Sequence, residues 1–406
     1  KAKQMQSERN IIYDVDVVIL GSGAAGMMAG ITTAEAGHSC VILEKGKSIV
    51  VSNAARSGGP ALADTRYQQE VGAVVSSEQL YRHMYSFSRG TVHAGLLRNA
   101  VEKGARVEDI FRRNQIELEL LPDTYGVGFR ARHMFKEGGA RRWGALMKDF
   151  ENMGGMVSFG RAGVKLIISD GRVQGVLAKD VISNGKWYEY RARAVLIATG
   201  GYLGDQKMIQ EHSCGVYVNA LGSKLSDGTG IRMALEAGGV EDRNWGICAN
   251  EFGGANQKIK KEGRAYSSSL RYAVYGGLLV NGAGRRFMNE QYLSDKPLSI
   301  GGEIILREGK FYAVIDRDMY EGLKSGTVYD YYGRPKQWHA GRMTHDMPSR
   351  FREIDLTKDI EEGWACCEES LEKAGAYFGL KHLTETVIQG LLPGRGCRRI
   401  YLKLSR

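Results

Sequence analysis

Proline is scarce in this 406-residue sequence, with only 6 residues, whereas glycine is abundant at 54. Together with 43% hydrophobic residues, this balance excludes a disordered or fibrous chain and is typical of a glycine-rich α/β enzyme. The six cysteines show no CxxC or CxxCH spacing, which argues against a c-type haem or an iron–sulfur cluster. They are expected to be reduced, mostly structural thiols.

Long uncharged runs are also missing. The longest one, Val17 to Ala34, contains four glycines, so no transmembrane helix is expected. No signal peptide is visible, and a cytoplasmic location is expected. Because the sequence begins at Lys1 rather than Met, an export signal that has been removed stays open as an alternative.

Lysine and arginine outnumber aspartate and glutamate by 56 to 46, a formal net charge of +10. The two signs are interleaved over most of the chain, which excludes a nucleic-acid footprint of basic and aromatic residues. The end differs, because Arg395, Arg398, Arg399, Lys403 and Arg406 occur there without any acidic residue. The remaining excess of positive charge is typical of a solvated surface, or of a protein that binds an anionic cofactor or substrate.

An apolar run at residues 17–20 leads into a GSGAAG motif. In this pattern Gly21 allows a tight turn, Gly23 lets backbone amides approach a pyrophosphate, and Gly26 permits close packing of helix on strand. Glu44, eighteen residues later, ends a second apolar run, where a carboxylate accepts hydrogen bonds from ribose hydroxyls. The spacing predicts a dinucleotide-binding strand, turn and helix without choosing between NAD and FAD.

Strand and helix patterns continue to alternate beyond the motif. Helical segments are expected at 96–113 and 143–153, and an Asp170-Gly171 turn joins two strands of a hairpin. A continuous apolar strand at 194–199 ends in Gly200-Gly201, as in strands buried on both faces of a parallel sheet. The pattern predicts an α/β fold with a parallel sheet and an antiparallel meander.

The α/β alternation fades from about residue 240. The length of the chain allows two or three domains. We expect a first domain at 1–240, a second at 241–390, and a separate basic tail at 391–406.

Together these residues resemble the FAD-binding flavoproteins of the fumarate reductase and succinate dehydrogenase family, which includes 3-ketosteroid dehydrogenases and urocanate reductase-like enzymes. The resemblance covers most of residues 13–390. Five motifs carry it, in the family's order: GSGAAG with Glu44, the Ser57-Gly58-Gly59 loop, the ATGG strand at 198–201, the DGTG helix start at 227–230 and the LVNxxGxRFxNE block at 279–290.

The resemblance implies a Rossmann-like FAD-binding domain and an α+β capping domain that closes over flavin and substrate. It places the isoalloxazine near the loop at 56–59 and the adenine beside Gly163-Val164. The residues expected to bind FAD are Gly21, Gly23, Ala24, Ala25, Gly26, Glu44, Lys45, Ser52, Asn53, Arg56, Ser57, Gly58, Gly59, Gly163, Val164, Ala198, Thr199, Gly200, Gly201 and Asp227. Ser52 stands where respiratory members carry a flavin-linked histidine, so the FAD is expected to be non-covalent. No metal is expected.

The family reaction moves a hydride between flavin N5 and an activated C=C or CH–CH bond while a side chain exchanges a proton. Ser294 occupies the place of the fumarate reductase acid, Leu270 and Ala273 replace its proton relay, and 244–254 lacks the substrate-binding histidine. Fumarate is therefore not the expected substrate, and an enone, a steroid-like ketone or another unsaturated acid stays open.

Tyr292, two residues after Glu290, lies close to the tyrosine that exchanges the proton in ketosteroid dehydrogenases. The alternative interpretation is that Tyr292 is a packed aromatic residue. Arg286 and Glu290 are catalytic candidates that could hold the cap over the flavin, or form an ordinary ion pair. His133 could touch cofactor or substrate, with a structural histidine as the alternative.

Family members continue past the end of this sequence and return to the first domain, whereas 391–406 does not look like family sequence. A frameshift or artificial truncation is expected to explain that tail. Two functions stay open: an FAD-dependent reductase or dehydrogenase acting on CH–CH bonds, and a non-catalytic flavin-binding fragment. With no second dinucleotide fingerprint, the enzyme would need a small-molecule substrate and an external reductase, electron carrier or quinone.

Overall fold

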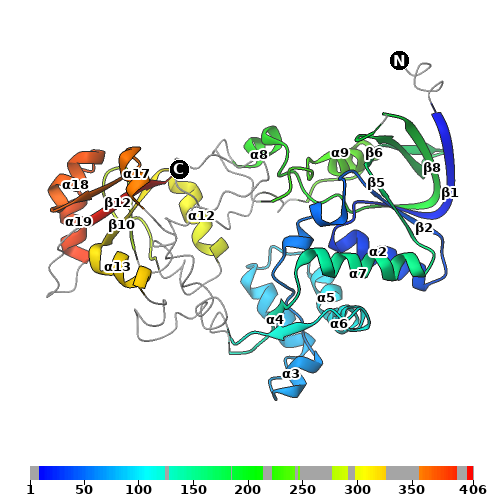
Figure 1. Cartoon of the computed structure of the whole chain (residues 1–406), viewed down its shortest axis with the longest axis horizontal. Helices are drawn as coiled ribbons and strands as arrows, with labels where there is room; N and C mark the ends of the chain where they lie inside the picture. Colours follow the sequence, from blue (N-terminus) through cyan, green and yellow to red (C-terminus); the bar gives the residue numbers. More distant parts are fainter. Residues whose placement is uncertain are drawn as a thin grey trace. The chain divides into compact units, whose positions relative to one another are not determined.

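The protein is described by a computed structural model that divides into two compact units, 1–119 with 133–246, and 120–132 with 247–406 (Figure 1). The structure describes residues 9–123, 128–183, 185–213, 222–242, 246, 277–290, 298–325, 356–390 and 400–405. The division falls a few residues after the predicted boundary at 240, and it assigns 120–132 to the second unit. The functions given to the two parts stay predictions.

A six-stranded sheet of order β5-β2-β1-β8-β7-β6 forms the centre of the first unit. Its strands are β1 (Arg9–Leu20), β2 (Cys40–Glu44), β5 (Met156–Phe159), β6 (Arg161–Ser169), β7 (Arg172–Asp180) and β8 (Trp187–Ile197). The pairs β2–β5, β1–β2 and β1–β8 are parallel, whereas β6, β7 and β8 form an antiparallel meander. The predicted parallel sheet with a meander is therefore confirmed.

Helices α2 (Ala24–Glu35) and α7 (Gly139–Asn152) lie side by side on one face of this sheet (Figure 1). Ile19, Met27, Ile42 and Phe150 are fully buried in the core between them. Five residues of β2 are buried in succession, because both faces of a parallel strand are covered. On the other face the meander packs its own core around Tyr190.

The remaining elements of the first unit are mostly short. They are η1 (Ile49–Val51), η2 (Ala54–Arg56), α3 (Arg66–Glu70), α4 (Ser77–Phe87), α5 (Ala94–Glu102), α6 (Gly104–Arg113), β3 (Leu118–Leu120), β4 (His133–Phe135), α8 (Gln206–His212) and α9 (Thr229–Glu236). The single helix predicted over 96–113 was wrong. Lys103 leaves the helical region with ψ 7°, and a second helix begins at Gly104.

The second unit contains an antiparallel sheet of order β11-β12-β10-β9. Its elements are β9 (Leu278–Asn281), α12 (Leu298–Glu308), β10 (Phe311–Asp316), α13 (Arg317–Ser325), α17 (Thr357–Glu361), β11 (Ala365–Glu368), α18 (Leu371–Phe378), α19 (Leu383–Gly390) and β12 (Ile400–Ser405). Val280, Tyr312 and Leu383 are buried in its core. Residues 400–405, from the predicted separate tail, form a strand between β10 and β11.

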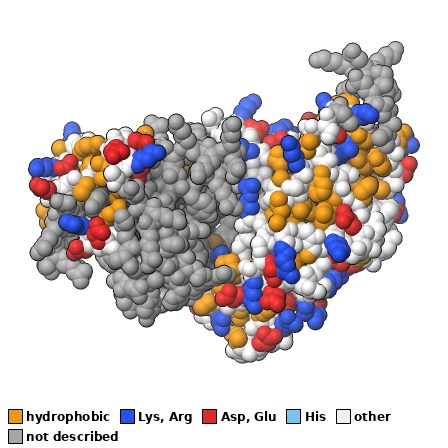
Figure 2. Space-filling model, in the orientation of Figure 1, with side chains coloured by type: hydrophobic (Ala, Val, Ile, Leu, Met, Phe, Trp, Pro, Cys, Tyr) orange, Lys and Arg blue, Asp and Glu red, His pale blue; other side chains and the backbone are white. Residues whose placement is uncertain are grey.

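Charged side chains of both signs are interspersed on the face drawn in Figure 2. Many are paired; Glu35, for example, accepts hydrogen bonds from both Arg106 and Arg113. Among the helices of the described residues, none combines the length and apolar character needed to span a bilayer.

Gly144, in the middle of α7, offers a direct test of helix propensity. A Cβ at this position would meet no atom within 4 Å, so alanine adds no clash and removes the conformational freedom of glycine. Gly144→Ala is expected to raise the free energy of unfolding by about 0.5–1 kcal/mol in urea denaturation. A variant less stable than the wild type would contradict the open surroundings of this residue.

Candidate functional site

The turn between β1 and α2 has the backbone geometry that the GSGAAG motif predicts. Gly21 adopts φ +99°, and a Cβ there would lie 2.6 Å from the Ala198 carbonyl oxygen. A Cβ on Gly26 would lie 1.9 Å from the Gly21 carbonyl oxygen, so helix and strand touch backbone to backbone. Gly23 instead faces open space and caps α2 without a side-chain hydrogen bond. The helix thus presents free positive potential to an anion.

Glu44 ends β2 and turns its carboxylate toward this turn. Oε2 accepts hydrogen bonds from Ser22 N at 3.0 Å and Ser22 Oγ at 2.7 Å, and Oε1 accepts one from Gly46 N at 2.7 Å. The residue is buried, whereas Ala24 and Ala25 in the first turn of α2 are exposed. The carboxylate is therefore held in one orientation, with acceptor capacity left for a further donor.

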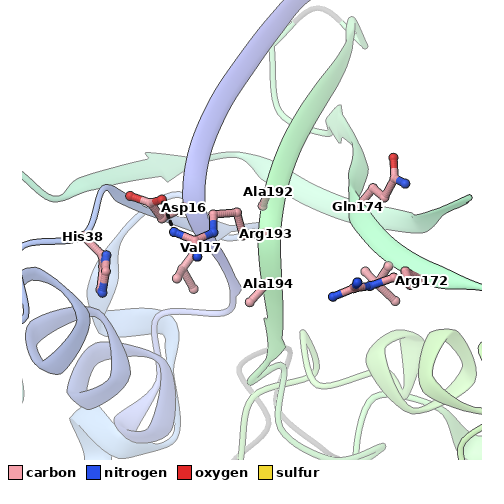
Figure 3. A pocket seen from close by; sticks show the side chains of 9 residues that line it. Asp16, Val17, His38, Arg172, Gln174, Ala192, Arg193 and Ala194 are labelled. Carbon is pink, nitrogen blue, oxygen red and sulfur yellow. Dashed lines mark hydrogen bonds and ion pairs between the residues drawn. The ribbon is translucent and has the colours of Figure 1, made fainter.

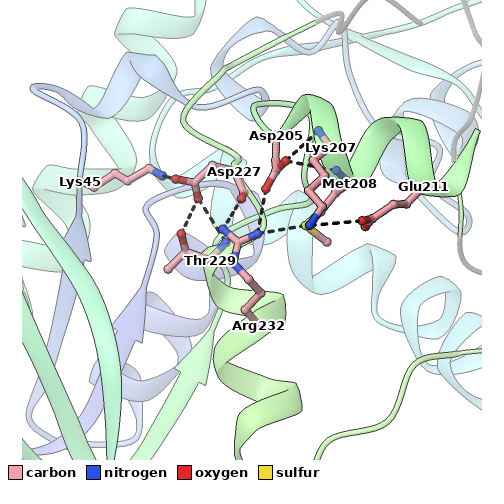
Figure 4. Close-up of polar contacts among 8 residues, drawn as sticks. All are labelled: Lys45, Asp205, Lys207, Met208, Glu211, Asp227, Thr229 and Arg232. Carbon is pink, nitrogen blue, oxygen red and sulfur yellow. Dashed lines mark hydrogen bonds and ion pairs between the residues drawn. The ribbon is translucent and has the colours of Figure 1, made fainter. Parts of the chain in front are cut away.

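Lys45 and Asp227, both predicted to bind cofactor, are joined to each other (Figure 4). Lys45 Nζ lies 2.8 Å from Asp227 Oδ2, while Oδ1 accepts a hydrogen bond from the Thr229 hydroxyl at 2.7 Å. Arg232 donates to the Asp227 carbonyl oxygen at 2.8 Å and to the Asp205 carboxylate at 2.9 Å. This network ties the end of β2 to the start of α9.

Burial alone would raise the pKa of the Asp227 carboxyl, but hydrogen bonds from Lys45 and Thr229 outweigh it and hold the pKa below its usual value. A depressed carboxyl pKa stabilises the fold above the unfolded value of about 3.9, and this stabilisation disappears as the pH falls through the folded value.

Asp227→Asn is therefore expected to lower the free energy of unfolding at pH 7 by at most about 1 kcal/mol, because solvent screens a side chain that is 41% exposed. Urea denaturation at pH 7 and at a series of lower pH values checks the effect, which should shrink as the pH falls below about 3.9. Asp109→Asn, which breaks the exposed pair with Arg112, serves as the control. An Asp227→Asn deficit that does not decrease as the pH is lowered would rule out the ionic origin.

The loop expected beside the isoalloxazine begins with Ser52 and Asn53, whose side chains form hydrogen bonds within the protein. Ser52 Oγ accepts a hydrogen bond from Ala55 N at 3.3 Å, and Asn53 Oδ1 accepts one from Ser223 N at 2.7 Å. Residues 56–58 are exposed. One side of the loop thus contacts the rest of the protein, and the other side is exposed.

The second half of the loop is docked on β4. The Gly58 carbonyl oxygen accepts a hydrogen bond from Phe135 N at 2.8 Å. Gly59 adopts φ +152°, and a Cβ there would lie 2.1 Å from the His133 carbonyl oxygen. The His133 ring is fully buried, with Nε2 2.9 Å from Thr65 Oγ1, which favours the structural alternative for this histidine.

The ATGG strand continues β8 alongside the dinucleotide turn. Ala198 N donates to the Leu20 carbonyl oxygen at 2.9 Å, at the carboxyl end of β1. Gly163 of β6 packs on the Leu20 side chain, where a Cβ would meet Cδ2 at 2.9 Å. Val164 next to it is 39% exposed. The structure therefore brings these predicted residues to the edge where β1 ends.

Close backbone approach also governs the step from β8 to α9. A Cβ on Gly230 would lie 2.1 Å from Thr199 Oγ1, so the helix packs directly on the strand end. Gly200 adopts φ +77°, and the Gly201 carbonyl oxygen accepts a hydrogen bond from Gly228 N at 3.1 Å. Gly200 and Gly230 thus fulfil backbone requirements that other residues would meet only with strain.

Arg286 and Glu290 of the second unit form an ion pair, with Arg286 Nε 3.0 Å from Glu290 Oε2. Glu290 Oε1 also accepts a hydrogen bond from Leu279 N of β9 at 3.0 Å. The hydrogen bond that Arg286 donates to the Glu290 carboxylate raises the pKa of Arg286. This pairing secures the turn after β9, and a catalytic role for either residue stays a prediction. Tyr292 lies outside the described residues.

Other positions from the fumarate reductase comparison also lie outside the described residues. They are Ser294, Leu270, Ala273 and, apart from Gly246, the segment 244–254.

Two residues of α7 were not predicted. The indole N–H of Trp143 donates to the Ser22 carbonyl oxygen at 3.1 Å, and Arg142 donates to the carbonyl oxygens of Ala55 and Ser57 at 3.1 Å each. Both contact loops that carry predicted cofactor residues. The sequence predicted a helix over 143–153 and a glycine-rich helix start before it, but gave no role to these two side chains.

A cavity of about 570 Å³ lies elsewhere in the first unit (Figure 3). It is lined by Asp16, Val17, His38, Arg172, Val173, Gln174, Ala192, Arg193 and Ala194. None of these residues belongs to the predicted cofactor set. Across the described ranges, no group of three or more His, Cys, Asp or Glu side chains could hold a metal ion.

Comparison with known proteins gives the family. The model of a family described as "FAD binding domain" matches residues 16–297. NADH:fumarate oxidoreductase of Klebsiella pneumoniae is 27% identical over 320 residues, covering 77% of this chain and 33% of that protein. Vinyl phenol reductase of Lactiplantibacillus plantarum is 25% identical over 309 residues, covering 74% of this chain and 61% of that protein. The chain thus spans less than two thirds of each relative.

The fold agrees with a solved structure. The 3-ketosteroid-Δ4-(5α)-dehydrogenase from Rhodococcus jostii superposes with a TM-score of 0.67 at 20% identity, covering 97% of this chain and 83% of that one. This likeness shows the α/β flavoprotein fold. Because the family model matches well over half of the sequence, the chain belongs to the FAD-binding domain family of fumarate reductase, ketosteroid dehydrogenase and urocanate reductase relatives.

Proposed function

We propose that the chain binds FAD non-covalently and serves as an oxidoreductase acting on an activated C=C or CH–CH bond of a small organic molecule. The observation that carries the proposal is the open backbone at Gly23, on the uncapped N-terminus of α2. A pyrophosphate fits this position, because it needs both close approach to the backbone and positive potential.

The neighbouring residues fit the other parts of the ligand. The held carboxylate of Glu44 retains acceptor capacity for ribose hydroxyls. Val164 offers an exposed apolar surface that an adenine ring would cover. The side chain of Ser52 lacks the imidazole that a histidyl linkage to flavin needs, which supports dissociable FAD.

Bound FAD would supply a hydride donor or acceptor at its N5 atom. The chain's task is to hold the loop at 56–59 beside that atom, exclude water and deliver a proton to the neighbouring substrate carbon. Tyr292 is the proposed proton donor. A phenol with a pKa near 10 stays neutral at pH 7 and can donate to a developing enolate.

The proposed substrates are enones, steroid-like ketones or unsaturated acids other than fumarate. The similarity to vinyl phenol reductase of Lactiplantibacillus plantarum supports reduction of an activated C=C bond. Electrons would reach the flavin from a separate reductase, an electron carrier or a quinone. A non-catalytic flavin-binding fragment is the second candidate, because the chain spans only 33% and 61% of two relatives.

Flavin titration followed by reoxidation tests the proposal. The purified chain should quench FAD fluorescence stoichiometrically, and the dithionite-reduced complex should be reoxidised anaerobically by at least one compound in a panel of enones and unsaturated acids. Binding without reoxidation by any of them would favour the fragment. Failure to retain FAD would overturn both candidates.

A further inference from the structure

Arg142 of α7 places a charged group in the interior, next to the loop expected to contact the flavin. The residue is 4% exposed. Its Nη2 donates hydrogen bonds to the carbonyl oxygens of Ala55 and Ser57 at 3.1 Å each, and its Nη1 donates one to the carbonyl oxygen of Glu137. All three acceptors are neutral backbone groups, so the guanidinium contacts the backbone of two separate segments.

Among the described residues no carboxylate lies within salt-bridge distance of Arg142, although the more distant charge of Glu137 partly offsets the effect of burial on its pKa. The guanidinium lies 4.0 Å from the centroid of the Phe135 ring, and its Nε has no hydrogen-bond acceptor. The Glu137 carboxylate pairs with Arg141 at 3.0 Å instead. Burial lowers the pKa of the Arg142 guanidinium, which nevertheless stays charged as arginine does in proteins. An unpaired buried charge is costly, so a hydrophobic residue would fill this space at lower cost.

The contacts of Arg142 determine how the loop presents its peptide groups. The Ser57 carbonyl oxygen points at Arg142, and among the residues that the structure describes no peptide bond is cis. In a trans peptide the N–H points opposite to the C=O, so the Gly58 N–H is directed away from Arg142. Gly58 is exposed, and its amide therefore faces outward, where the loop is expected to meet the flavin.

We propose that Arg142 is a positioning residue for the flavin: it sets the loop at 55–58, and its buried charge, which forms no salt bridge among the described residues, raises the reduction potential of the bound cofactor. The inference rests on the proposed function. Reduced flavin carries more negative charge than oxidised flavin near neutral pH. A nearby cation in a low-dielectric interior therefore stabilises the reduced form more than the oxidised form.

Substitutions of Arg142 distinguish its positioning of the loop from the effect of its charge on the reduction potential. Arginine spans two carbonyl groups of the loop and one at Glu137 with its planar fork, whereas a lysine ammonium is a single point charge. Arg142→Lys keeps the charge and loses part of the hydrogen bonding. Arg142→Met loses both while retaining most of the side-chain volume. Arg141→Met, on the neighbouring exposed residue, is the matched control.

The experiment measures the affinity of each apoprotein for oxidised FAD by fluorescence quenching, and the midpoint potential of each complex by equilibration with a reference dye. Arg142→Met is expected to bind oxidised FAD about tenfold more weakly. Its preference for reduced over oxidised flavin should also fall at least tenfold, which corresponds to a midpoint potential about 30 mV more negative. Arg142→Lys should show the weaker binding with an unchanged potential, and Arg141→Met should match the wild type.

An Arg142→Met complex with wild-type affinity and potential would overturn the inference while leaving the proposed function intact. Should Arg142→Met fail to fold, Arg142→Lys decides: weakened FAD binding at wild-type potential supports the inference, and wild-type binding overturns it. A wild-type chain that binds no FAD would overturn the proposed function, and the inference with it.

Discussion

Gly26→Ala is expected to lower the free energy of unfolding by about 3 kcal/mol or more, with loss of flavin binding. A Cβ at this position would lie 1.9 Å from the Gly21 carbonyl oxygen and 3.0 Å from its carbon. Both atoms belong to the backbone, so no rotamer change relieves the overlap. Helix α2 would have to move away from β1, which opens the core around Ile19 and Met27. Urea denaturation measures the effect.

Gly23→Ala provides the contrast, because a Cβ there meets no protein atom within 4 Å. The stability of the apoprotein is expected to fall by no more than about 1 kcal/mol, the cost of alanine in place of glycine at a helix N-cap. The affinity for FAD should fall about 100-fold, since the methyl group occupies the space that a pyrophosphate needs. Equal FAD affinity in Gly23→Ala and wild type would show that the ligand does not approach this glycine.

Tyr292→Phe is expected to slow the reoxidation of reduced flavin by an enone about 10²-fold or more. Phenylalanine keeps the ring and removes the hydroxyl that would donate the proton. The rate is measured by anaerobic stopped-flow absorbance after mixing the reduced complex with the substrate identified by the panel. FAD affinity should not change, because the proposed role concerns the substrate carbon.

Tyr377→Phe is the matched control, since Tyr377 is 50% exposed on α18 of the same unit. It should react at the wild-type rate. If Tyr292→Phe also reacts at that rate, Tyr292 is a packed aromatic residue and another group delivers the proton.

The parts of the fold that could be predicted from the sequence are those with short-range causes. The apolar run before Gly21 and the run ending at Glu44 became the parallel pair β1 and β2. The Asp170-Gly171 turn joins β6 and β7, with Asp170 at φ +52° and Gly171 at φ +71°. The break between α5 and α6 was missed, because the residues around Lys103 form a helical pattern and the end of a helix depends on its packing.

The candidate site shows the same limit at the level of side chains. Lys45 and Asp227 were both expected to face the cofactor, yet they form an ion pair with each other. Asn53 holds the backbone of Ser223, 170 residues away in the chain. Sequence spacing carries no information on such pairs, because the partners meet only after the sheet and its helices have packed.

The sequence by itself determined the dinucleotide turn, the strand-helix alternation and the FAD-binding family, because glycine conformation and apolar periodicity act between neighbouring residues. Only the tertiary structure decided which polar groups meet. It formed the Lys45–Asp227 ion pair and directed the Arg142 guanidinium, 87 residues from Ala55, at the carbonyl groups of the loop at 55–58. The physical reason is that a buried polar or charged group takes the partners that packing brings within reach, whatever their separation in the chain.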